Sequence, residues 1–325
     1  MKIITIKEAT PLLGAIAFGI IDRGTNLLQV RCTSVCNLNC PFCFTNAGST
    51  STTHQVEYTV EKDHLVKWIK KVIELKQERD IEINLDSAGE VSTYKDLIAL
   101  IQDIKKIQEV SFISMQCNGQ LLTESFVDQL EEAGLNRINL SIHSLNKEKS
   151  KLLMGCSFYD IEKIKRVAKY IAQSKIELEI APVLMNGINN EDVEELIQFA
   201  KEIASKILIQ NYLEYKNSRT MKGVKELNWF KFYRLLTEWE KKYSIKLKYG
   251  PRDFNLRRTK KLPLLMKKGE KIQARILEIG WLHGEMLASY KERLITIEKS
   301  KNKIGDKANI VITKTKDGIY YGKKA

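Results

Sequence analysis

The chain has 325 residues, 43% of them hydrophobic, which is enough for one large α/β domain and a smaller second one. No apolar run reaches the roughly 18 residues of a membrane-spanning helix. The apolar segment 11–21 lacks a signal-peptide cleavage site, so we expect a cytoplasmic protein without a membrane span. The net charge of +13 is uneven: residues 1–215 carry 24 basic and 29 acidic residues, and residues 216–325 carry 29 and 11. This asymmetry indicates a catalytic part followed by a polyanion-binding part, or only a solvated basic surface.

Strand-like and helix-like segments alternate through residues 26–215. Short apolar runs predict strands at 26–31, 81–85, 109–115, 137–142, 176–183 and 207–213. Apolar residues at three- and four-residue spacing predict helices at 60–76, 94–107, 123–133, 160–173 and 190–203. This repetition predicts parallel strands joined by right-handed crossovers, with a ligand site at their C-terminal ends. It fits both a six-stranded partial barrel and a doubly wound sheet.

The rest of the chain has a different pattern. Residues 216–262 are basic and contain one predicted helix, 229–242. From Pro263 onward, short glycine-punctuated runs predict a small five-stranded barrel with strands at 271–279, 285–288, 294–298, 308–313 and 319–321. We therefore expect four parts: an N-terminal lead-in (1–25), an α/β domain (26–215), a basic helical linker (216–262) and a β-barrel (263–325).

Four of the six cysteines fall within twelve positions, which favours metal binding over disulfides in a cytosolic chain. Cys36, Cys40 and Cys43 have the spacing C-x3-C-x2-C after the first predicted strand of the α/β domain. Three thiolates would leave one iron of a four-iron cluster open to another ligand. The alternatives are a zinc site completed by Cys32 and a plain electron-transfer cluster. Zinc ligands usually come as two separated pairs, and an electron-transfer protein would not need so long a chain.

Further polar motifs follow at the ends of the predicted strands. They are Ser87-Ala88-Gly89-Glu90, Gln116-Cys117-Asn118-Gly119, Asn139-Leu140-Ser141-Ile142-His143 and Gly187-Ile188-Asn189-Asn190. With the cysteine spacing, and in this order, they resemble the motifs of the radical S-adenosylmethionine (radical SAM) superfamily over about residues 26–215. Residues 14–31 also resemble the lead-in of uncharacterised archaeal members with a TRAM-like tail. The resemblance implies an α/β fold: a partial (β/α)6 radical SAM barrel, here followed by the C-terminal small OB-like β-barrel.

The resemblance also implies cofactors. A [4Fe-4S] cluster on Cys36, Cys40 and Cys43 would bind S-adenosylmethionine (SAM) and cleave it reductively to a 5′-deoxyadenosyl radical. A ferredoxin- or flavodoxin-like protein would supply the electron. The residues that match SAM-contacting positions of the family are Phe42, Gly89, Glu90, Asn118, Ser141, His143 and Asn189. Of these, Glu90 suits the methionine ammonium group because it is a carboxylate.

Three positions depart from the family motifs: Ala88 replaces a glycine, Val91 a proline and Cys117 a threonine. Cys117 and Cys156 are candidate catalytic residues, because a cysteine in a radical SAM site can carry a methyl group or donate a hydrogen atom. The alternative is that each is a small buried apolar residue.

The segment from Pro263 resembles a TRAM domain, a small barrel with RNA-binding roles, through Lys268-Gly269-Glu270, Gly284-Glu285, Gly305-Asp306 and Gly322. The resemblance predicts RNA, and tRNA in particular, as the partner. Basic residues are expected to contact phosphates: Arg257, Arg258, Lys260, Lys271, Arg275, Arg293 and Lys314. Aromatic residues are expected to stack on bases: Trp281, Tyr290 and Tyr320.

The main hypothesis is therefore a radical SAM enzyme that modifies RNA, with tRNA as the expected substrate. The first alternative is radical modification of a peptide or a small metabolite. The second is a non-catalytic RNA-binding iron–sulfur protein.

Overall fold

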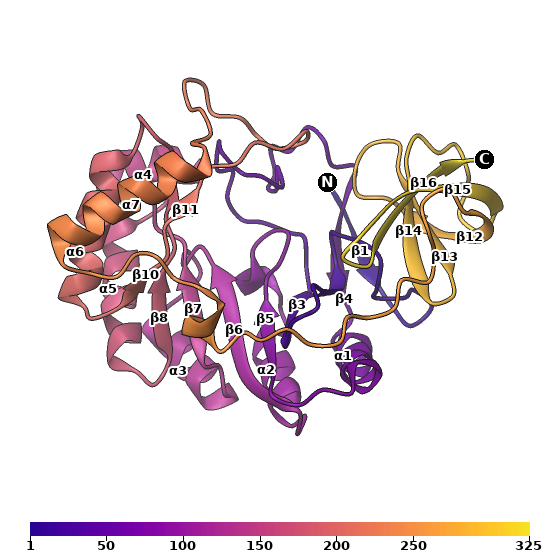
Figure 1. Ribbon diagram of the computed structural model, residues 1–325, viewed down its shortest axis with the longest axis horizontal. Helices are drawn as coiled ribbons and strands as arrows, with labels where there is room; N and C mark the ends of the chain where they lie inside the picture. The colour runs from indigo at the N-terminus through magenta and orange to yellow at the C-terminus, as the bar shows by residue number, and fades with distance from the viewer. The chain divides into compact units, whose positions relative to one another are not determined.

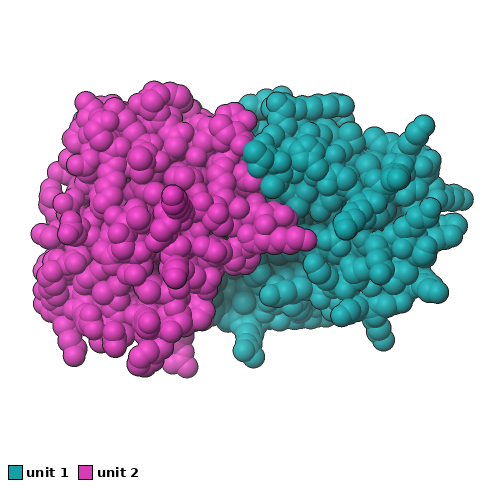
Figure 2. Space-filling model, turned by 90° about the horizontal axis from the view of Figure 1, so that it is seen from above, with its two compact units in different colours: residues 1–35, 51–113, 256–325 teal, residues 36–50, 114–255 magenta.

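A computed structural model describes residues 1–325. The chain forms two compact units (Figure 2). Unit 1 comprises residues 1–35, 51–113 and 256–325, and unit 2 comprises residues 36–50 and 114–255. No helix is long and apolar enough to cross a membrane.

Unit 1 contains one end of the main sheet (Figure 1). Strand β2 (Gly19–Asp22) lies antiparallel to β3 (Leu27–Arg31), and β3 lies parallel to β5 (Ile81–Leu85). A separate parallel pair joins β1 (Lys2–Ile6) to β4 (Val56–Val60). The helical elements of this part are α1 (Lys62–Lys76), a short 3-10 helix η1 (Val91–Thr93) and α2 (Leu97–Lys105).

The C-terminal residues of unit 1 form a closed barrel, drawn in yellow in Figure 1. Its strands are β12 (Lys271–Ile279), β13 (Met286–Tyr290), β14 (Arg293–Ile297), β15 (Lys307–Lys316) and β16 (Ile319–Lys324). Inward-facing apolar residues alternate with exposed polar ones along β12, and Ile276, Ile295 and Ile310 fill the centre. The order β12-β13-β14-β16-β15 confirms the predicted small OB-like barrel.

Unit 2 contains the other strands of the main sheet. The second half of the long strand β6 (Val110–Cys117), from Ser114, belongs to this unit. It is followed by β7 (Arg137–Leu140), β8 (Glu177–Ile180) and β10 (Lys206–Ile207), and neighbouring strands are parallel. Beyond Pro182, β9 (Val183–Leu184) and β11 (Gln210–Asn211) form a short pair of their own.

Five helices of unit 2 connect or follow these strands: α3 (Glu124–Ala133), α4 (Lys147–Met154), α5 (Ile161–Gln173), α6 (Asn190–Glu202) and α7 (Trp229–Tyr243). A short 3-10 helix, η2 (Pro251–Phe254), follows α7. Thr123, Asn146, Asp160 and Asn228 start four of the helices by accepting backbone hydrogen bonds in the first turn.

The main sheet has the strand order β10-β8-β7-β6-β5-β3-β2. The parallel strands β3, β5, β6, β7, β8 and β10 therefore follow one another in chain order. A doubly wound sheet would reverse its order at a switch point, so the partial-barrel alternative is the correct one. The predicted strands and helices all form, although 176–183 is split into β8 and β9 and 207–213 into β10 and β11. Strands β1, β2 and β4 and helix α4 were not predicted.

Candidate metal centre and cofactor site

The three cysteines of the C-x3-C-x2-C motif lie in the 36–50 loop of unit 2. Burial raises the pKa of Cys40, and the neighbouring charges of Cys43 and Cys36 raise it further, so the three thiols are close enough to interact. No three His, Cys, Asp or Glu side chains converge on a point as the ligands of one metal ion would. Thiolates that bind different irons of one cluster stand further apart than the ligands of a single zinc ion. Three soft thiolates in one loop are a donor set that fits an iron–sulfur cluster.

Cys32, the alternative fourth ligand of a zinc site, has polar and apolar neighbours of its own in unit 1. It is fully buried in unit 1, where its Sγ lies 3.6 Å from Ser87 Oγ. Burial raises the pKa of Cys32 to about 12.

Asn39 lies between the first and second cysteines of the motif, and its side chain links this part of the cysteine loop to the end of the loop at Thr50. Its Oδ1 accepts hydrogen bonds from the Thr50 amide at 3.0 Å and the Thr50 hydroxyl at 2.9 Å. Its backbone amide donates to Met154 O at the end of α4. The next residue, Gly155, has φ +59°, and a Cβ there would lie 2.1 Å from Asn39 O. Only glycine lets the end of α4 approach the loop this closely.

Arg219 also fixes the cysteine loop, and sequence reasoning missed it. Its backbone amide donates to Cys43 O at 2.9 Å, and its guanidinium donates to Cys40 O at 3.1 Å and Thr50 Oγ1 at 3.1 Å. Arg219 lies in the segment predicted as a basic linker, far along the chain from the cysteines. No motif distinguishes it there from the lysines around it.

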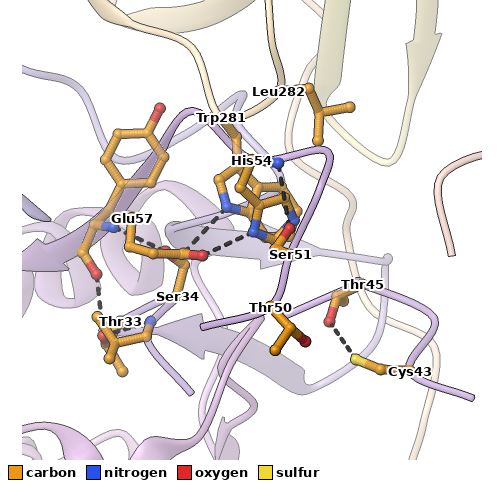
Figure 3. Close-up of polar contacts among 12 residues, drawn as sticks. Thr33, Ser34, Cys43, Thr45, Thr50, Ser51, His54, Glu57, Trp281 and Leu282 are labelled. Atoms are coloured by element: carbon orange, nitrogen blue, oxygen red, sulfur yellow. Dashed lines mark hydrogen bonds and ion pairs between the residues drawn. The ribbon is translucent and has the colours of Figure 1, made fainter. Parts of the chain in front are cut away.

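Asn118, directly after β6, contacts the same loop. Asn118 donates from Nδ2 to Asn37 Oδ1 at 2.8 Å, between the first two cysteines. Ser141 Oγ accepts from Gln116 Nε2 at 2.8 Å. Thr45 Oγ1 lies 3.2 Å from Cys43 Sγ (Figure 3).

Phe42 and His143 are in direct contact, with ring centroids 4.8 Å apart in an edge-to-face arrangement. Phe42 packs among apolar residues of unit 2, including Leu153 and Met185. His143 is buried, and burial lowers its pKa to about 4, so its imidazole is neutral. Its Nδ1 accepts from the Val183 amide at 3.1 Å, which places the ring proton on Nε2.

Asn189 shapes the turn before α6, and its predicted contact with SAM stays a prediction. The side chain is fully buried. Its Nδ2 donates to His143 O and Val183 O, and its Oδ1 accepts from the Met185 amide at 2.8 Å. Asn189 therefore positions His143 and the turn before α6.

In unit 1, Gly89 and Glu90 meet the backbone that leads into the cysteine loop. A Cβ on Gly89 would lie 2.2 Å from Val35 O, and the Glu90 amide donates to the same oxygen at 2.8 Å. Glu90 Oε1 accepts from the Ser92 amide and hydroxyl and starts η1. Because Val35 directly precedes Cys36, this turn is anchored where the cysteine loop begins.

A buried polar cluster in unit 1 surrounds Glu57 (Figure 3). Glu57 Oε1 is 2.7 Å from His54 Nδ1, and Oε2 accepts from Trp281 Nε1 at 3.2 Å and from Ser34 Oγ. The cluster joins the barrel, through Trp281, to Ser34, two residues before Cys36.

Cys117 and Cys156 are both buried. Cys117 ends β6, and Cys156 follows α4 and Gly155. Their catalytic roles stay predictions.

The barrel and the segment before it hold the predicted RNA contacts. Six of the seven basic residues are exposed: Arg257, Arg258, Lys260, Lys271, Arg275 and Lys314. Arg293, in contrast, is buried, and burial lowers its pKa. The guanidinium of Arg257 already donates to Glu78 Oε2 at 3.0 Å and Arg79 O at 2.8 Å.

The predicted stacking residues are mostly enclosed. Trp281 and Tyr320 are buried and cannot stack on a base, so this prediction was wrong for both. Tyr290 is half-buried and has Lys291 Nζ 5.2 Å from its ring centre.

A hollow of about 540 Å³ lies elsewhere in unit 1, lined by the end of α1, the residues directly after it and residues 106–109. It contains none of the residues predicted to bind the cluster or SAM.

Comparison with known proteins supports the interpretation of the cysteine loop. The Radical SAM superfamily model matches residues 30–200. The chain is 37% identical to an uncharacterized protein, MJ0103, of Methanocaldococcus jannaschii, over 98% of this chain and 79% of that protein. It is 29% identical to a GTP 3′,8-cyclase of Clostridium botulinum, over 55% of this chain and 54% of the cyclase.

Among solved structures, SuiB of Streptococcus suis has a similar fold, with a TM-score of 0.52 and 18% identity over 69% of this chain and 48% of SuiB. The chain thus spans about half the length of both the cyclase and SuiB.

Proposed function

Because this chain belongs to the radical SAM superfamily, we propose that it modifies RNA, with tRNA as the expected substrate, by SAM-dependent radical chemistry. The superfamily uses a [4Fe-4S] cluster and SAM. When bound, the cluster supplies the electron that cleaves SAM to methionine and a 5′-deoxyadenosyl radical. In this chain, Cys36, Cys40 and Cys43 are the residues that would hold the cluster. The enzyme needs a reductant, for which we propose a ferredoxin- or flavodoxin-like protein of the cytoplasm.

The residues of unit 2 would support this chemistry by binding SAM and by keeping water away from it. Phe42 and the apolar residues around it form a buried wall behind the cysteine loop. The neutral His143 adds no charge there. Asn118, which contacts Asn37 in the loop, and Ser141 are proposed to orient SAM.

The observation that carries the RNA proposal is the outer face formed by β12, β15 and β16, here called the basic face. Arg275 lies directly opposite Lys307, and both are exposed. Like charges opposite each other destabilise a sheet, so this pair favours an anionic ligand. Lys271 and Lys323 lie on either side of Val311. The exposed side chains between these cations are the neutral amides Gln273 and Asn309.

Such a face suits phosphates, because each cation that neutralises a phosphate releases counterions. The proposal interprets the barrel as a TRAM-like RNA-binding module. Arg258 and Lys260, in the exposed segment before the barrel, are proposed to add contacts.

The test uses the full chain with Arg275→Ala and Lys307→Ala combined. We expect weaker binding of an unmodified tRNA transcript and a shallower dependence of affinity on salt, by about one unit of slope per lost phosphate contact. The matched control combines Lys301→Ala and Lys303→Ala, which removes the same charge from exposed residues between β14 and β15. Equal affinity losses in the two double variants would count against a specific basic face.

The modified nucleoside is then identified by mass spectrometry of tRNA from cells with and without the gene. A nucleoside missing only from the deletion strain supports the proposal, and identical nucleoside profiles contradict it.

A second candidate is radical modification of a free nucleotide. It is favoured by the similarity to GTP 3′,8-cyclases, which covers 55% of the chain. The discriminating experiment incubates the reduced, cluster-loaded protein with SAM and either GTP or tRNA. Formation of 5′-deoxyadenosine together with consumption of GTP, and no change in the tRNA, would select this candidate over RNA modification.

A further inference from the structure

Two exposed aromatic rings lie side by side next to the cysteine loop of unit 2. Phe44 follows the last cluster cysteine, and its ring centre is 6.3 Å from that of Tyr215. The two side chains are 55% and 56% exposed. The rings are tilted by 58°, so they do not stack face to face and leave surface for a third ring.

Hydrogen bonds fix the backbone that carries Tyr215. The Ser218 hydroxyl donates to Tyr215 O at 2.8 Å and accepts from the Tyr215 amide at 3.1 Å, which closes a turn at 215–218. The next residue, Arg219, ties this turn to Cys40 and Cys43. Phe44 is held by its position next to Cys43.

Single exposed aromatic residues are common on protein surfaces and need no explanation. Phe44 and Tyr215, in contrast, contact each other, and both are attached to the loop that would carry the cluster. An aromatic surface held in place binds planar rings at little cost in conformational entropy. Lys216, the next residue in the chain after Tyr215, is an exposed cation.

We propose that Phe44 and Tyr215 form a binding site for a nucleobase, which they position next to the cluster-bearing loop. This inference rests on the proposed function and adds the residues that select the reacting nucleotide. The base belongs either to RNA or to a free nucleotide, since both present the same planar ring.

The test compares Phe44→Ala and Tyr215→Ala with Phe44→Trp and Tyr215→Phe, all in the full-length, cluster-loaded protein at equal iron content. The probes are an unmodified tRNA transcript and GTP. Stacking on one aromatic ring changes affinity by roughly 5- to 150-fold, so each alanine variant should lose at least about 5-fold and each aromatic variant should keep wild-type affinity. The control is Phe158→Ala, which removes a 69% exposed ring elsewhere in unit 2.

Loss of tRNA affinity alone assigns the base to RNA, and loss of GTP affinity alone assigns it to a free nucleotide. Wild-type affinity in Tyr215→Ala and Phe44→Ala would overturn the inference while leaving the proposed function intact. A wild-type protein that binds neither probe would overturn both. Tyr215→Ala provides an independent result if Phe44→Ala fails to load its cluster.

Discussion

The guanidinium of Arg219 donates to the carbonyl oxygen of Cys40, the middle cysteine of the motif, over 3.1 Å. Its positive charge also opposes the rise in the pKa of Cys40 that burial causes. Arg219 thus acts on both the shape of the cysteine loop and the ionisation of the Cys40 thiol.

We expect Arg219→Gln to bind less iron at neutral pH. Without the positive charge the pKa of Cys40 rises further, fewer thiolates form, and metal binding requires the thiolate. The difference in bound iron between Arg219→Gln and the wild-type protein should become smaller as the pH is raised. The measurement is iron and sulfide per chain after reconstitution at pH 7 and pH 9, with Arg234→Gln on the surface of α7 as control. Wild-type loading of Arg219→Gln at both pH values would contradict this role.

Gly155→Ala should displace the cysteine loop. The new Cβ would lie 2.1 Å from Asn39 O, so backbone has to move, and the positive φ adds strain. Gly187→Ala is the matched control, because Gly187 also has a positive φ but no atom within 4 Å of the added Cβ. Cluster absorbance should fall strongly in Gly155→Ala and little in Gly187→Ala. Similar losses in both would show that backbone strain, and not contact with the loop, is responsible.

Lys76→Ala should destabilise unit 1. The Lys76 ammonium is fully buried, 2.8 Å from Asp22 Oδ1, and also donates to Thr259 Oγ1 and Lys260 O. Removing one partner of a buried ion pair costs about 3–5 kcal/mol in the free energy of unfolding. Lys71→Ala breaks a surface pair with Glu292 and should cost less than about 1 kcal/mol. Urea denaturation of both variants measures the difference, and equal costs would refute the expectation.

His143 should make the protein less stable in mild acid. Its pKa is lowered to about 4 in the folded state, so between the unfolded pKa and pH 4 the unfolded chain binds a proton that the folded chain does not. The free energy of unfolding should therefore fall by about 2–3 kcal/mol from this group between pH 7 and pH 4.5. His143→Gln lacks the titrating group and should show a correspondingly smaller fall in urea denaturation. Parallel pH profiles for the two proteins would argue against a buried neutral histidine.

The sequence predicted the strands and helices well, because each buried element repeats apolar residues at its own period. It also predicted Lys271 and Arg275 as basic residues that could contact a ligand, and both are exposed on β12, where they alternate with buried residues. The same reasoning failed at β14, whose five residues are all buried. There the Leu294 amide donates to Leu13 O and the Tyr320 amide to Gly14 O, so the N-terminal segment covers the outside of the barrel and buries Arg293.

Part of the candidate site was also beyond sequence reasoning. The cysteines and Asn118 belong to contiguous motifs, and the structure brings them together. Arg219 and Tyr215 reach the cysteine loop only through the fold, since no local pattern distinguishes them. The boundaries between the four predicted parts stay predictions.

The contacts around Glu57 affect how the C-terminal barrel can be studied. Tyr58 donates its hydroxyl to Ile279 O at 2.7 Å, and Gln55 donates to Gly280 O and Glu285 O at 2.9 Å each. A chain shortened to end before the barrel would strip partners from these buried groups, including Glu57 itself, and expose apolar surface in unit 1. Such a truncation would impair the shared core along with any ligand binding. The contribution of the barrel to recognition is therefore measured by substitutions on its outer face.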